Sequence, residues 1–396
     1  MVLEKKTLAT AYVYVALFVL AVCTCLKMYG QESDNGSSIV NAFFAFTFLI
    51  WGMSVFKVSS DRYLIEKPST TIVLFNIYFA WTILITAIMP PEGVKLRTHI
   101  LNVMFMALPM IVMNMMYYFV KRRGSSRHLL WAFFVIALMF VMTYASFYDT
   151  DNILMNVHLG SSYYALYILP LVMMSPSKVL KIGGLIIVSF AVFSSVKRGG
   201  VLALLMGALV YVVVQQSVTT GKSKLMRIVI LIFLVSLLAV IFLYIGTLGD
   251  NDIFERFEDL EEDSGSGRLF VWAETWRVIN DQDIFGYIVG NGYNAVVGVS
   301  RYVLSAHNDY LEAWYDFGLI GFILYVSAVL SLLFRNLQSI RMRASYAPAF
   351  SMMSVLIIIL SMISHIAIYF WMNIVMLNVA YFIGRMDYER KRIDTE

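Results

Sequence analysis

Charged residues are scarce in this 396-residue sequence, and their scarcity excludes an ordinary water-soluble domain. Asp, Glu, Lys and Arg together make up 14% of the chain, hydrophobic residues make up 60%, and the mean hydropathy is +0.75. Soluble domains contain about 25% charged and about 45–50% apolar residues. The composition therefore predicts an integral membrane protein, in which the placement of charges matters more than the net charge of +4.

Cysteine is almost absent, and so is a cleavage signal near the N-terminus. Cys23 and Cys25 are so close in sequence that on a helix their side chains point in different directions, and a disulfide between them is not expected. The first apolar segment, residues 8–28, lacks a clear small-residue cleavage site, which indicates a retained membrane span.

Apolar segments of bilayer-spanning length recur along the whole chain. A helix needs about 20 apolar residues to cross about 30 Å of hydrocarbon. The expected fold class is an all-α polytopic membrane protein with about twelve transmembrane helices in a single domain over residues 1–396. The candidate spans are 8–28, 39–56, 70–89, 99–120, 128–147, 162–175, 179–196, 199–216, 225–246, 311–333, 347–363 and 366–384.

The distribution of lysine and arginine predicts which side of the membrane each link faces. With the N-terminus in the cytoplasm and alternating spans, most of the 30 Lys and Arg residues fall in cytoplasmic links, as the positive-inside rule requires. Both termini are then cytoplasmic. Residues 247–310 form one large outward loop with short helices, and His307 lies at the outer end of the tenth span.

Three cations on the predicted outer side point to an anionic ligand. Lys197 and Arg198 lie in the turn between the seventh and eighth spans, where snorkelling to the interface explains Lys197 equally well. Gly199 and Gly200 leave room for a bulky group beside the Arg198 guanidinium. Arg268 falls in the first turn of a predicted helix, where the dipole and free N–H groups favour an anion; an arginine facing water is the simpler interpretation.

Residues 264–279 predict an amphipathic helix on the outer membrane surface, with Ser264 or Ser266 as its N-cap. Its apolar face is formed by Leu269, Phe270, Trp272, Ala273 and Trp276, with Glu274 and Arg277 elsewhere around the helix. Interfacial anchoring explains most aromatic residues of this region, although one or two, such as Trp272 and Tyr293, are candidates for stacking on sugar rings.

Acidic residues are concentrated at 250–263, where a solvated helix is the best interpretation. The D-x-D spacing of Asp250 and Asp252, repeated at Asp149 and Asp151, is only weak evidence for a metal ion. No metal and no other cofactor is therefore expected.

Four short motifs together resemble a known family. They are G-R-x₃-W at 267–272, G-N-G-Y-N at 290–294, H-N-x-Y-L at 307–311 and D-x-G-L-I-G at 316–321. Their order and spacing resemble the O-antigen polymerase and O-antigen ligase superfamily, as do the span count and the large outward loop. The resemblance covers roughly residues 190–325, and its loosest part is K-R-G-G, where many relatives have a serine before the arginine.

The resemblance implies a bacterial inner-membrane glycosyltransferase that works at the periplasmic face without nucleotide sugar or metal. Its substrate would be an oligosaccharide on undecaprenyl pyrophosphate, embedded in membrane lipid. Chain-length regulator and flippase proteins are implied as partners, and nucleic acid is not. His307 resembles the family's general base, Arg268 its loop arginine and Arg198 the arginine near the seventh span.

The expected chemistry suits these residue types. Displacing a lipid pyrophosphate from an anomeric carbon puts negative charge on the leaving group, which fixed arginines stabilise, while a histidine accepts the proton of the attacking hydroxyl. Asn308, Asp309 or Glu312 would orient the imidazole, and the sequence does not choose among them. The substrate-binding candidates are Lys197, Asn308, Asp309, Tyr310, Glu312, Trp272 and Tyr293. The remaining histidines, His99, His128, His158 and His365, are interpreted as interfacial or packed.

Alternative functions stay open at this point. G-N-G-Y-N, and the Tyr and Leu after His-Asn, favour a polymerase that joins lipid-linked repeat units by inverting transfer. A ligase would instead move the finished glycan onto lipid A core or onto protein. A transporter or flippase is less consistent, because the two halves of the chain show no similarity and the longest link follows the ninth span.

Overall fold

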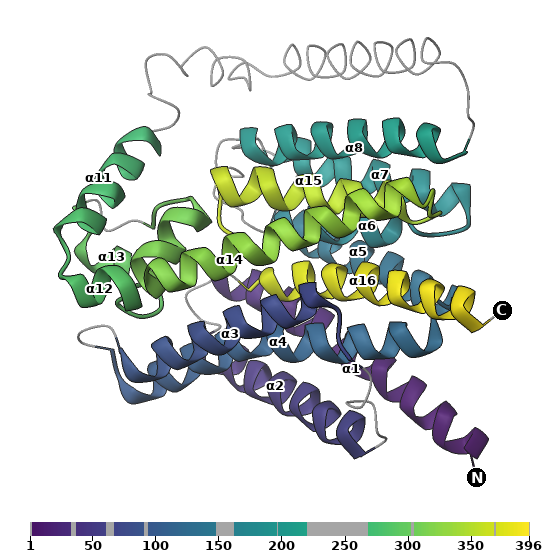
Figure 1. Ribbon diagram of the computed structural model, residues 1–396, viewed down its shortest axis with the longest axis horizontal. Helices are drawn as coiled ribbons and strands as arrows, with labels where there is room; N and C mark the ends of the chain where they lie inside the picture. Colours follow the sequence, from purple (N-terminus) through teal and green to yellow (C-terminus); the bar gives the residue numbers. More distant parts are fainter. Residues whose placement is uncertain are drawn as a thin grey trace. The chain divides into compact units, whose positions relative to one another are not determined.

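The computed structural model describes residues 2–32, 37–60, 67–90, 94–147, 162–195, 197–219, 268–301, 305–367 and 370–395. Within these ranges the protein is α-helical, without any strand (Figure 1). Six of the described helices are long and apolar enough to cross a membrane, and three shorter apolar helices accompany them. The predicted all-α membrane protein is confirmed at this level, whereas the count of about twelve spans and their orientation stay predictions.

Most predicted spans correspond to helices with closely similar bounds. The helices before the large loop are α1 (Val2–Glu32), α2 (Ser37–Ser60), α3 (Thr70–Ile88), α4 (Leu96–Arg123), α5 (Arg127–Ala145), α6 (Ser162–Val172), α7 (Lys178–Ser194) and α8 (Arg198–Thr219). Those after it are α11 (Arg268–Asp281), α12 (Ile284–Val289), α13 (Ala295–Val299), α14 (Asp309–Arg341), α15 (Ala347–Ile363) and α16 (Met372–Thr395). The predicted span 225–246, the acidic segment 250–263, Asp149, Asp151, His158, Ser264 and Ser266 lie outside the described residues.

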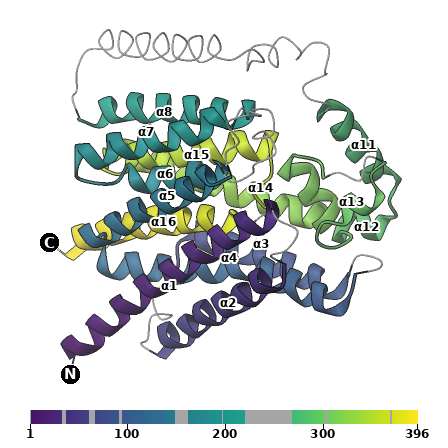
Figure 2. The same cartoon turned by 180° about the vertical axis from the view of Figure 1, so that it is seen from behind.

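The chain divides into two compact units. The first comprises Met1–Val73, Leu96–Ser195 and Phe370–Glu396. In it α4 and α16 pack along each other (Figure 2), because Gly384 lets α16 approach the backbone carbonyl of Tyr117. The Tyr117 hydroxyl then donates to Asp387 at 2.6 Å. Close approach of small residues is a usual way to pack helices that cross a membrane.

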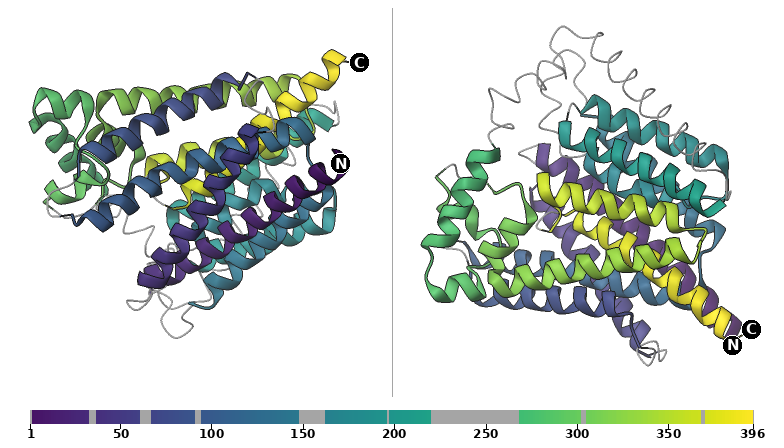
Figure 3. Two further views of the ribbon diagram at one scale, coloured as in Figure 1. Left: turned by 90° about the horizontal axis from the view of Figure 1, so that it is seen from below. Right: turned by 45° about the horizontal axis from the view of Figure 1, so that its top comes forward.

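The second unit comprises Leu74–Lys95 and Val196–Tyr369 and contains all residues of the candidate site. Its helices α8 and α15 pack side by side, with Gly207 against Met352 and Leu356. The short helices α11, α12 and α13 gather beside the first part of α14 (Figure 3). An apolar cluster of Val278, Ile279, Val296 and Tyr315 joins them. Burial of these side chains fixes the short helices to α14, because apolar surface is removed from water.

Gly318 divides α14 into two parts. Its φ of +70° and ψ of 179° are not helical, and a Cβ there would lie 2.2 Å from the carbonyl oxygen of Ile288. The Trp81 indole donates to the Phe317 carbonyl at 2.8 Å and so satisfies an acceptor next to this break. The span expected at 311–333 lies within α14, which is long and apolar enough to cross a membrane, and Gly318 interrupts it near its start.

Candidate functional site

His307 occupies a strained backbone position directly before α14. Its φ of +51° lies in the left-handed region, which residues with a Cβ seldom adopt. Asn308 caps the helix, since its side-chain oxygen accepts from the N–H groups of Tyr310 and Leu311 at 3.0 and 3.2 Å. Asn308, which was expected to orient the imidazole or bind substrate, therefore caps the N-terminus of α14. This cap fixes the start of the helix directly after His307.

Glu312 contacts the loop that carries His307. The backbone N–H groups of Ala306 and His307 and the Ser305 hydroxyl lie near its buried carboxylate, and one of its oxygens lies 3.2 Å from Nδ1 of His365. Glu312 was one of the residues expected to orient the imidazole, and here it faces the backbone of His307. The partial positive charges of these N–H groups beside the carboxylate favour the strained conformation.

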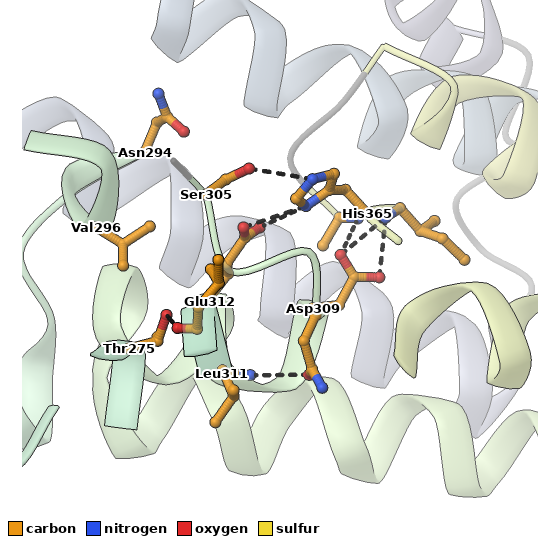
Figure 4. Close-up of polar contacts among 12 residues, drawn as sticks. Thr275, Asn294, Val296, Ser305, Asp309, Leu311, Glu312 and His365 are labelled. Carbon is orange, nitrogen blue, oxygen red and sulfur yellow. Dashed lines mark hydrogen bonds and ion pairs between the residues drawn. The ribbon is translucent and has the colours of Figure 1, made fainter. Parts of the chain in front are cut away.

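His365 is a second histidine in the site, which sequence reasoning treated as an ordinary packed residue. Its ring centroid lies 4.2 Å from that of His307. Nε2 of His365 lies 3.1 Å from the Ser305 hydroxyl and Nδ1 lies 3.2 Å from a Glu312 oxygen (Figure 4). His365 is buried, as expected, but it is buried against the proposed base. Only its polar position between two apolar segments could have drawn attention to it.

Asp309 holds the turn that carries His365. Its fully buried carboxylate accepts from the backbone N–H groups of Ile366 and Ala367 at 2.8 and 3.0 Å (Figure 4). It also accepts from the Tyr325 hydroxyl at 3.2 Å. Because Ile366 and Ala367 are engaged in this way, they are not part of the last helix. The final predicted span is thus wrong at its start: α16 begins at Met372 instead of residue 366.

The predicted cations come from two further elements of the same unit. Arg268 is the first residue of α11, Arg198 is the first residue of α8, and Lys197 directly precedes it; all three are half-buried. Burial, and to a lesser extent the charges of His365, Arg268 and Lys197, lower the pKa of His307 to about 3. Burial likewise lowers the pKa of His365 to about 4, with contributions from Arg268 and Lys197. Both imidazoles are therefore neutral near pH 7, in a positive field that favours an anion.

The surface helix α11 buries an acidic residue and exposes apolar ones. Its buried face includes Glu274, whose carboxylate accepts from the Arg277 guanidinium at 2.8 and 2.9 Å. These hydrogen bonds lower the pKa of Glu274 to about 2. Leu269, Phe270 and Trp276 are exposed instead, while Trp272 is half-buried. The apolar face therefore points away from the protein, as in a helix that rests on a membrane surface.

Two of the family-like motifs form a backbone clasp. Asp316 accepts through its backbone oxygen from the N–H groups of Asn291 and Gly292, and through its carboxylate from the N–H groups of Asn294 and Val296. Gly290 makes this possible, because its φ is +101° and a Cβ would lie 2.5 Å from the Asp316 carbonyl. Half-buried Tyr293, expected to stack on sugar, belongs to this clasp segment, which joins α12 and α13 to α14.

Comparison with known protein families gives a match over the segment that contains most of the candidate site residues. A family model described as O-antigen ligase matches residues 183–326, which include Lys197, Arg198, Arg268 and His307. A comparison with curated proteins returns no match. His365 lies beyond the matched segment. Residues 183–326 of this membrane protein therefore belong to the O-antigen polymerase and ligase superfamily of glycosyltransferase-like enzymes.

Proposed function

We propose that the protein is a polymerase of O-antigen or a related surface polysaccharide. It joins repeat units carried on undecaprenyl pyrophosphate, at the periplasmic face of the bacterial inner membrane. The observation that carries this function is the gathering of Arg268, Lys197 and His307 in one compact unit, close enough for both cations to lower the pKa of the histidine. Arg198 adjoins Lys197 and is included in the proposed anion site.

The reaction follows from the roles these groups can take. The hydroxyl oxygen of the acceptor sugar bonds to the anomeric carbon of the donor, while the bond from that carbon to the pyrophosphate oxygen breaks. His307 accepts the hydroxyl proton, and undecaprenyl pyrophosphate leaves with the electron pair of the broken bond. Attack opposite the leaving group inverts the anomeric configuration. The cations stabilise the charge that develops on the pyrophosphate.

A low pKa of His307 in the free protein is compatible with this role. A base that is always unprotonated is ready to accept a proton, but a pKa of about 3 makes it weak. Binding of a pyrophosphate beside Arg268 and Lys197 offsets their charges and raises the pKa of His307. The donor thus strengthens the base that uses it. Burial, the larger cause of the shift, does not depend on the donor.

The second candidate is an O-antigen ligase, because the matching family, although described as O-antigen ligase, is shared by ligases and polymerases. A ligase would use the same anion site and the same base, with lipid A core as the acceptor. Purified protein mixed with a lipid-linked repeat unit distinguishes the two on a gel. A ladder of products supports the polymerase, transfer only after addition of lipid A core supports the ligase, and no turnover in either mixture would contradict both.

A further inference from the structure

The pairing of two imidazoles is not explained by a mechanism that uses a single base. His365 comes from the turn after α15, whereas His307 precedes α14, yet their rings are in contact, with centroids 4.2 Å apart and planes tilted by 39°. Every polar atom of the His365 ring is also engaged, because Ser305 lies at Nε2 and Glu312 at Nδ1. Such a neutral ring with two fixed partners has one orientation and one tautomer.

The residues that contact His365 also lie next to the backbone of His307. Ser305 and His307 belong to the same short segment, and Glu312, which contacts the His365 ring, lies near the backbone N–H of His307. The segment, the carboxylate and the second imidazole therefore constrain one another (Figure 4). His307 itself is only half-buried, so without a neighbour on its ring face its side chain could rotate.

We propose that His365 is a positioning residue: held by Ser305 and Glu312, its ring packs on His307 and fixes that imidazole in the orientation that accepts the proton of the acceptor hydroxyl. This role rests on the proposed function of His307 as the base. A misplacement of about 1 Å is enough to cost about 100-fold in rate.

The charged surroundings of His365 bear on its protonation. Glu312 and Asp309 approach from α14, Arg268 from α11 and Lys197 from the segment before α8, with His307 on its ring face. The carboxylate of Asp309 favours the protonated ring, whereas burial and the two cations favour the neutral ring and prevail. A neutral His365 adds no charge beside His307, so it orients the base without repelling the proton that the base must take.

The test compares His365→Phe, which keeps an aromatic ring but loses both polar contacts, with His365→Asn, which keeps a donor for Glu312. We expect kcat to fall about 100-fold in His365→Phe and less in His365→Asn, with KM for the lipid-linked donor nearly unchanged. The acid limb of the kcat profile should also move to higher pH in His365→Phe, since a neighbour that can become positive is removed. If His365 only stabilised the fold, the loss would not be confined to kcat and the pH profile would not shift.

Matched variants keep this inference separable from the proposed function. His128→Ala is the control, because His128 is exposed on α5 in the other unit. If His307→Ala is inactive while His365→Phe keeps wild-type kcat and pH profile, the positioning role is overturned and the base survives. If His307→Ala is fully active, the proposed function itself fails. Should His365→Phe not fold, Ser305→Ala tests the same network, and an unchanged kcat in that variant would equally overturn the role.

Discussion

Acidic and basic residues around His307 differ in what they do, and we call Asp309 and Glu312 the acidic side of the site and Arg268 and Lys197 its basic side. The buried carboxylate of Asp309 accepts hydrogen bonds from the backbone N–H groups of Ile366 and Ala367, and that of Glu312 contacts the His365 ring. Arg268 and Lys197 are half-buried, and their charges lower the pKa of both imidazoles. The acidic side therefore holds the segment that carries His365, whereas the basic side acts through its charge.

This difference separates the polar residues that stabilise the fold from those that take part in the reaction. Asp309 and Glu312 were expected to orient the imidazole of His307, yet Asp309 binds backbone N–H groups of the His365 turn and Glu312 contacts the His365 ring. Asp316 likewise binds backbone N–H groups. A carboxylate bound in this way stabilises the fold around it. Variants on the acidic side should therefore cost stability first, and variants on the basic side should cost activity while the protein stays folded.

The largest expected effect comes from substitution of His307. His307→Ala should lower turnover by about 10²–10⁴-fold, because the acceptor hydroxyl loses its base. Turnover is measured with a lipid-linked repeat unit, alongside His128→Ala as the control. Turnover within a few-fold of wild type in a folded His307→Ala protein would contradict the role of His307 as the base.

Arg268→Lys tests the basic side with the charge retained. We expect kcat/KM to fall about 10–100-fold, since lysine cannot make the bidentate contact of a guanidinium with phosphate oxygens. Thermal unfolding in detergent should be unchanged. Arg277→Lys is the matched control on the same helix, because Arg277 binds Glu274 and Asp281. Equal losses in both variants would indicate that α11, and not an anion contact, is being disturbed.

Asp309→Asn tests the acidic side. An amide keeps the size of the carboxylate but weakens the bonds to Ile366 and Ala367, so we expect a loss of about 1–3 kcal/mol of unfolding free energy. Thermal unfolding measures this, with exposed Asp281→Asn as the control. An unchanged stability together with a large rise in KM would reverse the roles assigned to the two sides.

The smallest expected effect is in the pH dependence. Because the pKa of His307 is lowered to about 3, the free protein keeps this ring unprotonated as the pH falls through 6.5. A bound pyrophosphate raises that pKa, so kcat should begin to decline at a higher pH than kcat/KM, which reports the free enzyme. Initial rates at several donor concentrations give both profiles. Coincident profiles would argue that the cations do not face the donor.

Sequence periodicity predicted the helices well because length and apolar composition determine them locally. The bounds of α3, α5 and α15 differ little from the spans expected at 70–89, 128–147 and 347–363. The break at Gly318 was missed, because it depends on the close approach of Ile288. The start of α16 was missed for a similar reason, since Asp309 engages residues 57 and 58 positions away.

The candidate site was predictable only in part. The charges of Arg268 and Lys197 were out of place in the sequence, and the structure puts both near His307. The burial of Glu274 in α11 was not predictable, because it depends on ion pairs with Arg277 and Arg301. The sequence offered only the polar position of His365 between two apolar segments, since its role depends on partners at Ser305 and Glu312 that only the fold brings to it.

The most direct test of the basic side is inhibition by undecaprenyl pyrophosphate, the released product, which needs the anion site but no acceptor. The inhibition constant should rise at least about 10-fold in Arg268→Lys and in Lys197→Gln relative to the wild type, and stay unchanged in Arg277→Lys. Equal inhibition of all four proteins would contradict a diphosphate site beside His307.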